Sequence, residues 1–495
     1  MVRSVEHVEA NVPAEVTKVR VIALPAFLRT VSQRFAGIWA VALLGCGCVL
    51  SQSKSGPVDP GIRSGPPGAG GPLPGLTADE TAFFQDGQDR FAQIHVVLGG
   101  SDDGLGPRFN SNQCLSCHAH PAAGGTSPAK NPLPDVAHLH GARNTIPWFI
   151  TADGPIREAR FKKSNGAPDG NVHALFVISG RTDAPGCNMA QYDFSYAGNP
   201  RTGQGGDPNI IFRIPTPVFG AGLIEAIPDS VILANIQSHA KEKWALGISG
   251  HPNAHLSGNV NRSANDGTIT RFGWKAQNKS LLMFSGEAYN VEMGISNELF
   301  PQERDETPPC LFTATPNDTQ SFTTPATTAT SNPAVISDIE AFANFMRLLA
   351  PPAPAPDTPS IANGRAAFTK IGCAHCHTPA LTTGKMIASG SAKVPSAALS
   401  HQTAHLWSDL LLHRMGKGLA DGITQGAAGP DEFRTAPLWG VGQRIYFLHD
   451  GRTSNLVEAI LAHHSKGSEA NRVIDHFNRL TVQEQQQIID FLRAL

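Results

Sequence analysis

Two short runs of cysteine and histidine are the residues of this sequence whose types and spacing best support chemistry. Each run has two cysteines three positions apart and a histidine directly after the second: Cys114, Cys117 and His118 in NQCLSCHAH, and Cys373, Cys376 and His377 in IGCAHCHTP. Such thiols add to the two vinyl groups of a haem as thioethers, and the histidine then lies below the iron as an axial ligand. The spacing therefore predicts two covalently bound haem c groups, with His118 and His377 as proximal ligands.

Two other interpretations of a Cys-x-x-Cys pair fit less well. A zinc half-site normally needs a second half-site, and exported proteins rarely contain one. A thioredoxin-like redox pair has no need of a histidine directly after it. Haem attachment explains all three residues of both runs.

The segments around the two runs form a repeat. Asp86–Ile94 and Asn363–Ile371 precede the runs, and each has a glycine followed four positions later by a phenylalanine on the same predicted helix face. Further along, Arg213–Gly222 (RIPTPVFGAG) resembles Arg434–Gly442 (RTAPLWGVG). A unit that occurs twice predicts two related haem domains.

The predicted boundary between these domains is rich in proline. Ser337–Ala350 has the apolar stripe of a helix, and residues 351–360, PPAPAPDTPS, then form a stiff linker. We expect an N-terminal cytochrome-c-like domain with insertions at 77–350 and a C-terminal one at 361–495. Thr77 with Glu80, and Thr481 with Glu484, predict capping boxes at the first and last helices. The predicted fold class is mainly α, with long irregular loops because the chain has 49 glycines and 38 prolines.

The N-terminus resembles an export signal. The apolar stretch Phe35–Gly45 is too short to cross a bilayer, and arginines precede it. It leads to Leu-Leu-Gly-Cys46, which resembles a bacterial lipoprotein signal in which this cysteine is lipidated. We expect a signal at 1–46, a flexible tether at 47–76, and a protein facing the periplasm that reaches a membrane only through its lipid. An ordinary cleaved signal, or a start codon placed too far upstream, are the alternatives.

Composition limits the remaining possibilities. The 495 residues are 41% hydrophobic and 16% charged, with a formal net charge of -2, so no basic surplus indicates a nucleic-acid partner. Cys187 and Cys310 lie outside the two runs and the signal. In an oxidising compartment such a pair usually forms a disulfide, whereas the alternative is two unrelated buried thiols.

The order of motifs resembles the bacterial di-haem cytochrome c peroxidase superfamily, in particular its branch of di-haem oxidoreductases or peroxidases, which also carries the label thiol oxidoreductase. The matching stretches are GLGPRFNSNQCLSCH, TPVFGAGLIEAIPD, ITRFGWKA, VEMGIS, GCAHCHTP, LLHRMGKGLADG, APLWGVG and FLHDGR, within Gly104–Arg452. The resemblance implies a protein of the bacterial cell envelope in which the N-terminal haem reduces hydrogen peroxide. Electrons would come from a small redox protein or a quinol-derived donor and pass through the C-terminal haem. The thiol oxidoreductase label has no support, since no spare Cys-x-x-Cys exists.

The resemblance also suggests roles for single residues at the first haem. The family uses a glutamate in an Asn-Pro-x-Glu-Met-Gly-like motif, which carries over to Glu292 in YNVEMGIS, where Val291 replaces the proline. Glu292 would move a proton during peroxide cleavage. Glu225 is a weaker candidate for this role. Met293 could instead bind the first haem iron, which would make that haem an electron carrier.

At the second haem the family places the distal ligand in the helix after FLHDGR. Here that helix contains His463, which aligns best, and His464, one position further; Met415 is a competing ligand. His449 is expected to be structural because the family does not use it as a ligand. A calcium ion between the domains is a further family feature, but no ligand set for it is readable. Two functions stay open: a di-haem peroxidase, favoured by VEMGIS and the long segment between the haem runs, or a non-catalytic di-haem electron carrier.

Overall fold

The computed structural model describes residues 56–97, 104–140, 142, 146–178, 185–194, 208–254, 269–302, 308–310, 316–318, 336–385 and 396–495. All of them belong to one compact unit, residues 54–495. The predicted export signal and Cys46 lie outside the described residues. Within the described ranges, no helix is both long and apolar enough to cross a membrane.

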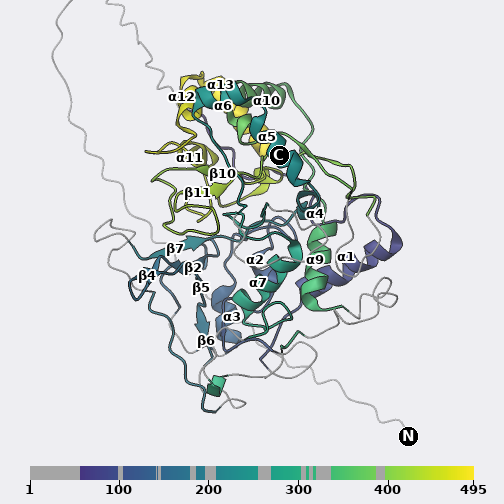
Figure 1. Ribbon diagram of the computed structural model, residues 1–495, viewed down its shortest axis with the longest axis vertical. Coiled ribbons are helices and arrows are strands. Elements are labelled where there is room, and N and C mark those ends of the chain that lie inside the picture. Colours follow the sequence, from purple (N-terminus) through teal and green to yellow (C-terminus); the bar gives the residue numbers. More distant parts are fainter. Residues whose placement is uncertain are drawn as a thin grey trace, which may run out of the picture. The chain divides into compact units, whose positions relative to one another are not determined.

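The elements up to residue 350 lie mostly around the first Cys-x-x-Cys-His motif, except that the two helices within residues 229–246 lie beside the second motif (Figure 1). In chain order they are α1 (Ala78–Phe91), β1 (Arg108–Phe109), α2 (Cys114–Cys117), α3 (Leu133–Leu139), β2 (Glu158–Phe161), β3 (Lys163–Ser164), β4 (Ala167–Pro168), β5 (Val172–His173), β6 (Phe176–Val177), β7 (Ile210–Arg213), α4 (Ala221–Glu225), α5 (Asp229–Gln237), α6 (Ala240–Leu246), α7 (Leu281–Met293), the 3-10 helix η1 (Pro308–Cys310) and α9 (Asp338–Leu348).

The remaining elements surround the second motif. They are α10 (Pro359–Ile371), η3 (Cys373–His375), β8 (Leu381–Thr382), β9 (Thr403–Ala404), β10 (Leu412–Arg414), β11 (Glu432–Arg434), η4 (Val441–Gln443), α11 (Leu456–Leu461), α12 (Asn471–Arg479) and α13 (Val482–Ala494). The capping boxes predicted for α1 and α13 are both present. The helix predicted at Ser337–Ala350 is confirmed as α9, with Ser337 as its N-cap.

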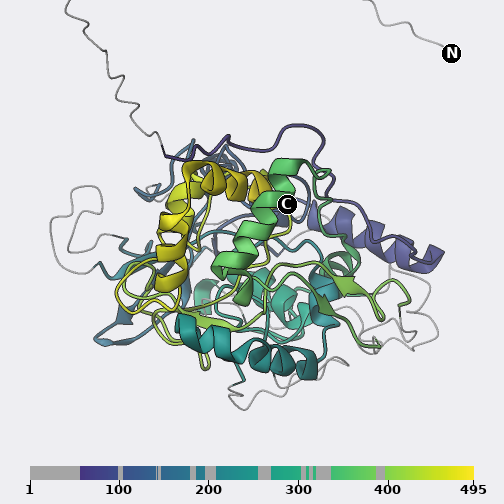
Figure 2. The same cartoon turned by 90° about the horizontal axis from the view of Figure 1, so that it is seen from above.

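The repeated glycine and phenylalanine have the same packing role in both halves. A Cβ atom on Gly87 would lie 2.3 Å from the carbonyl oxygen of Ala341, so glycine allows α1 to approach α9. A Cβ atom on Gly364 would lie 1.8 Å from the carbonyl oxygen of Gln487, and α10 approaches α13 in the same way (Figure 2). One turn later, each phenylalanine reaches the histidine of its motif. The ring centroids are 5.9 Å apart for Phe91 and His118, and 6.1 Å apart for Phe368 and His377.

The prediction of a mainly α fold is only partly confirmed. Helices contain 33% and strands or single bridges 13% of the described residues, so the fold is mixed. The longest sheet is antiparallel with strand order β5-β2-β7, in which Ala159 pairs with His173 on one side and Phe212 on the other. The strands are two to four residues long, too short to give a clear alternation of apolar and polar residues in the sequence.

Residues 56–76 differ from the flexible tether that their composition predicts. Asp59 is buried against α13, where both its carboxylate oxygens accept hydrogen bonds from Arg493, at 2.7 and 2.6 Å. Further along, the backbone N–H of Leu73 donates to the carbonyl of Leu348 at 2.7 Å. This segment therefore contacts the second half before it reaches the first.

The predicted disulfide is confirmed. Cys187 and Cys310, 123 positions apart in the sequence, are bonded to each other. Both are buried in a small cluster with Val177 and Met189.

Candidate haem sites

The first motif forms part of the wall of a large cavity. α2 carries Cys114 and Cys117, and His118 follows as its C-cap, so all three side chains line the same space. The cavity, its mouth included, measures about 1270 Å³.

His118 is prepared to bind a metal through one nitrogen. Its Nδ1 lies 3.0 Å from the carbonyl oxygen of Gly125 and donates to it, which leaves Nε2 without its proton. Such an outer hydrogen bond fixes the ring and the tautomer of metal-binding histidines. Burial lowers the pKa of His118 to about 4, although backbone hydrogen bonds oppose the shift, so the imidazole is neutral as a ligand must be.

Glu292 faces the same cavity as the first motif. It lies in the last turn of α7, and its Oε2 accepts a hydrogen bond of 2.7 Å from Asn110 Nδ2. The backbone carbonyl of Glu292 also accepts from the N–H groups of Asn110 and Ser111, at 2.7 and 3.2 Å. The carboxylate is therefore fixed against the segment that leads into the first motif. Met293 lines the cavity as well.

Glu225, the weaker sequence candidate, has a structural role. It is buried outside the cavity, where its Oε2 accepts a 2.8 Å hydrogen bond from Arg347 and its Oε1 accepts from the N–H of Leu281. The second contact lies at the start of α7. Glu225 thus holds the helix that carries Glu292 but does not touch the cavity.

The second motif lines a second cavity of about 1330 Å³, mouth included. Cys373, Cys376 and His377 all belong to its wall, as expected from the sequence. His377 repeats the arrangement of His118, since its Nδ1 donates to the carbonyl oxygen of Trp407 at 3.0 Å. Burial, with a smaller effect from nearby His463, lowers the pKa of His377 to about 4.

Two of the three predicted distal ligands face this second cavity. His463 lines it, and its Nδ1 donates to the carbonyl oxygen of Ala459 at 2.8 Å, so Nε2 is again left as an acceptor. Met415 lines it too. His464 is about half exposed and lies 3.5 Å from Asp475, outside the cavity wall. The structure therefore favours His463 over its neighbour.

Buried arginines line both cavities, and those of the second, which have no carboxylate partner among the described residues, create a demand for negative charge there. Arg434 and Arg444 line the second cavity; burial lowers the pKa of each to about 10, and their hydrogen bonds among the described residues go to backbone carbonyls. In the first cavity, the buried Nε of Arg213 has no hydrogen-bond partner in the described part of the chain. A haem has two propionate groups, which would supply this charge. The residues present therefore fit a haem in each cavity.

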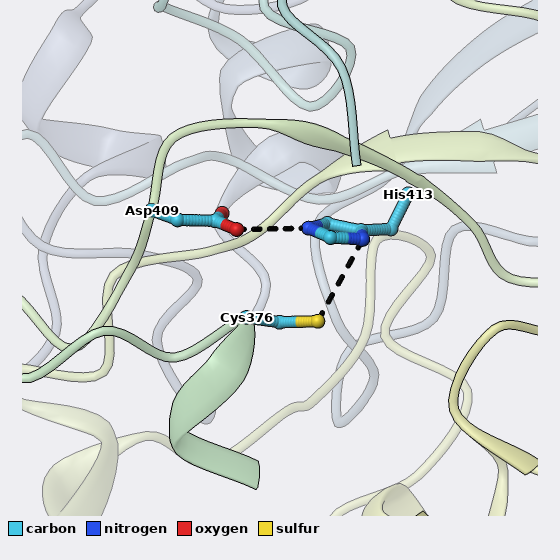
Figure 3. Close-up of side chains that lie close together, drawn as sticks. All are labelled: Cys376, Asp409 and His413. Carbon is cyan, nitrogen blue, oxygen red and sulfur yellow. Dashed lines mark hydrogen bonds and ion pairs between the residues drawn. The ribbon is translucent and has the colours of Figure 1, made fainter. Parts of the chain in front are cut away.

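A buried cluster lies behind the second motif (Figure 3). His413 is held between Asp409, 2.9 Å from its Nε2, and Glu469, 2.9 Å from its Nδ1, while the sulfur of Cys376 lies 3.6 Å from Nδ1. Burial favours the neutral ring, but these neighbours outweigh it and raise the pKa of His413 well above its usual value.

This cluster bears on the zinc alternative. Cys376, Asp409 and His413 lie close enough to hold a metal ion. However, both ring nitrogens of His413 donate to carboxylates, so neither has a lone pair for a metal.

Trp274 is a site residue that the sequence did not single out. It lines both cavities, and its Nε1 donates to the carbonyl oxygen of Ile214 at 2.9 Å. His449 and Phe433 continue from Trp274 into the second cavity, with their rings stacked at 4.3 Å. Trp274 belongs to the quoted stretch ITRFGWKA, but its position between two cavities depends on tertiary packing.

Comparison with known families identifies the class of protein. A family model described as "Di-haem oxidoreductase, putative peroxidase" matches residues 204–495, and the chain belongs to this family. The resemblance found in the sequence is thereby confirmed. The matched part contains Glu292 and the second motif, whereas the first motif precedes it. Comparison with curated proteins gives no match.

Three solved structures show partial similarity. The diheme peroxidase BthA from Burkholderia thailandensis E264 is 14% identical, with coverage of 60% of this chain and 89% of that chain and a TM-score of 0.26. A MauG-like protein associated with microbial copper homeostasis is 16% identical, with coverages of 49% and 79% and a TM-score of 0.25. Kuenenia stuttgartiensis hydrazine synthase is 19% identical, with coverages of 32% and 55% and a TM-score of 0.21. This chain thus spans about half of the hydrazine synthase chain, and no conclusion is drawn from likenesses at these scores.

Proposed function

We propose that this di-haem oxidoreductase reduces hydrogen peroxide at the first motif, with electrons that arrive through the second. The observation that carries the proposal is the shared cavity of His118 and Glu292, a metal-binding imidazole and a carboxylate at one enclosed site. A haem bound there would supply the electron-transfer chemistry of peroxide reduction.

The chain's own residues would supply the proton transfer. Peroxide cleavage requires a proton to move from the oxygen nearest the iron to the leaving oxygen, and a positioned carboxylate is suited to carry it. Asn110 holds Oε2 of Glu292 at 2.7 Å, so the carboxylate is oriented before substrate arrives. Arg160 and Arg213 line the same cavity, where each is paired with a carboxylate, Glu158 and Asp421 respectively.

The second cavity supports a different role. His377 and His463 both line it, and the Nδ1 of each donates to a backbone carbonyl, so their Nε2 atoms would hold the haem. A haem held by two histidines would supply electron transfer there. We therefore assign electron transfer to the site of His377.

The proposal includes export from the cytoplasm. The disulfide between Cys187 and Cys310 supports it, because such bonds persist in oxidising compartments. Lipid attachment at Cys46 remains part of the proposal.

A peroxide titration followed by optical and electron paramagnetic resonance spectroscopy tests the function. We expect high-spin haem at one site in at least one redox state, and its spectrum should change when stoichiometric peroxide is added. Low-spin haem at both sites in every state, with no response to peroxide, would contradict the proposal. That outcome would favour the electron-carrier alternative, for which the position of Met293 in the first cavity is the supporting observation.

A further inference from the structure

Two large apolar side chains are exposed on neighbouring helices beside the second haem site. Trp244 on α6 is 83% exposed, and Leu233 on α5 is 47% exposed. In Figure 2 these teal helices lie along the lower edge of the fold. Tryptophan is among the most buried residues on average, so such exposure in an ordered helix requires an explanation.

The helix pair is fixed directly to the second motif. Asn235 Nδ2 on α5 donates to Thr378 Oγ1 at 3.1 Å, and Thr378 follows His377 in the chain. Between the helices, the rings of His239 and His375 lie 5.6 Å apart. The exposed surface therefore has a fixed position relative to the second haem site.

A second connection leaves the other end of α6. The N–H and the hydroxyl of Ser249 both donate to Glu469, at 2.9 and 3.0 Å. Glu469 accepts from His413, whose ring lies 3.6 Å from the sulfur of Cys376. A continuous series of polar contacts thus runs from the exposed helix to a haem-attachment sulfur.

Basic side chains lie on α6 and on the elements beside it. Lys241 on α6 and Lys370 at the end of α10 are exposed, and Arg472 on α12 is exposed while one of its guanidinium nitrogens donates to the carbonyl of Ala245. Lys370 lies two residues before Gly372, the residue against which Leu246 of α6 packs. The exposed acidic side chain on α6 is Glu242. This surface would attract a partner with a negative face.

We propose that the surface around Trp244 is the docking site for a small acidic redox protein that delivers electrons to the second haem. This inference rests on the proposed function of the second site. One electron leaves the ferrous partner, which becomes ferric, and arrives at the iron held by His377, which changes from ferric to ferrous. The two exposed apolar side chains suit a transient complex, because stable interfaces bury about 1,200–2,000 Å² and need a larger apolar core.

The test measures electron transfer by stopped-flow absorbance with the oxidised full-length protein. Two probes are compared: a reduced acidic single-haem cytochrome, and hexaammineruthenium(II), a small reductant that needs no docking surface. For Trp244→Ala, the rate with the cytochrome relative to the rate with ruthenium should fall at least tenfold. Lys241→Glu should lower the same ratio most strongly at low salt. Val482→Ala, which removes an exposed apolar side chain on α13, is the matched control and should leave the ratio unchanged.

The other outcomes overturn the inference. An unchanged ratio in Trp244→Ala excludes docking at this surface, and a basic cytochrome that reacts as fast as the acidic one excludes the charge argument. If sedimentation shows that Trp244→Ala converts a dimer into a monomer, the surface joins two copies of the chain instead. None of these readouts uses peroxide, so a failure of the docking inference can be distinguished from a failure of the proposed peroxidase activity.

Discussion

Trp274 and His449 lie edge to face between the two haem cavities, with ring centroids 6.4 Å apart. Trp274 lines both cavities and His449 lines the second. Among the described residues, the Trp274 ring thus offers a direct protein connection between the two cavities. We therefore expect Trp274→Leu to slow electron transfer between the haems at least tenfold, with unchanged haem content. Flash reduction followed by transient absorbance measures this rate, and Trp274→Phe should retain more of it.

Covalent attachment of both haems is a direct prediction of the two motifs. After acid-acetone extraction, haem should remain with the chain, because thioethers survive this treatment. Haem in the organic phase in stoichiometric amount would contradict the prediction. His118→Ala and His377→Ala should each perturb the spectrum of one haem and leave the other nearly intact.

Glu292→Gln preserves the shape of the side chain and removes the base. Peroxide turnover should fall about 10²–10⁴-fold, the usual contribution of a positioned acid-base group. Steady-state assays with a small reductant measure this, and both haem contents should match wild type. Glu225→Gln is the informative comparison. Loss of the Glu225 charge weakens the ion pair with Arg347, so this variant should lower the free energy of unfolding more than it changes peroxide turnover. Wild-type turnover in Glu292→Gln would refute the assignment.

Variants of the two histidines at the end of α11 distinguish a haem ligand from a residue that only lies nearby. His463→Ala should change the low-spin spectrum of the second haem and its reduction potential, because it removes the predicted distal ligand. His464→Ala should leave both unchanged, since His464 lies outside the cavity. If Met415→Ala produces the spectral change instead, methionine is the ligand.

Asp421 is expected to control stability at low pH. Its carboxylate is fully buried between Arg213 and Lys275, at 2.7 and 3.1 Å. Burial alone would raise its pKa, but the two cations and their hydrogen bonds outweigh this and lower it from 3.8. A lowered pKa stabilises the fold above pH 3.8, and this contribution is lost as the pH falls through the folded-state value.

Replacement of this carboxylate gives the measurable form of the prediction. Asp421→Asn leaves two buried cations without a counter-charge, so urea unfolding at pH 7 should show a loss of about 3–5 kcal/mol. Asp153→Asn is the control, because its ion pair with Lys130 is exposed to solvent and its loss should hardly change the free energy of unfolding. Equal stability of the two variants would contradict the prediction.

Local sequence was sufficient for the features that short-range chemistry determines. The spacing of Cys114 and His118, the cap at Thr77, and the repeated glycine before Phe91 each depend on neighbouring residues. The short strands were not predictable, because pairs such as Ala159 with Phe212 join distant segments. The positions of Trp274 and Arg434 at the cavities were not predicted for the same reason, since these cavities form only when distant segments pack together.

The bond between Asp59 and Arg493 joins positions 434 residues apart in the chain. During synthesis, Asp59 cannot form this ion pair until Arg493 has been added to the chain. In a chain that stops before Arg493, the Asp59 carboxylate would lack its cationic partner. Residues 56–76 should then be more accessible to proteases. Residues 56–76 can therefore take up this arrangement only after α13 has been made, so a change at Arg493 would first loosen the chain at Asp59.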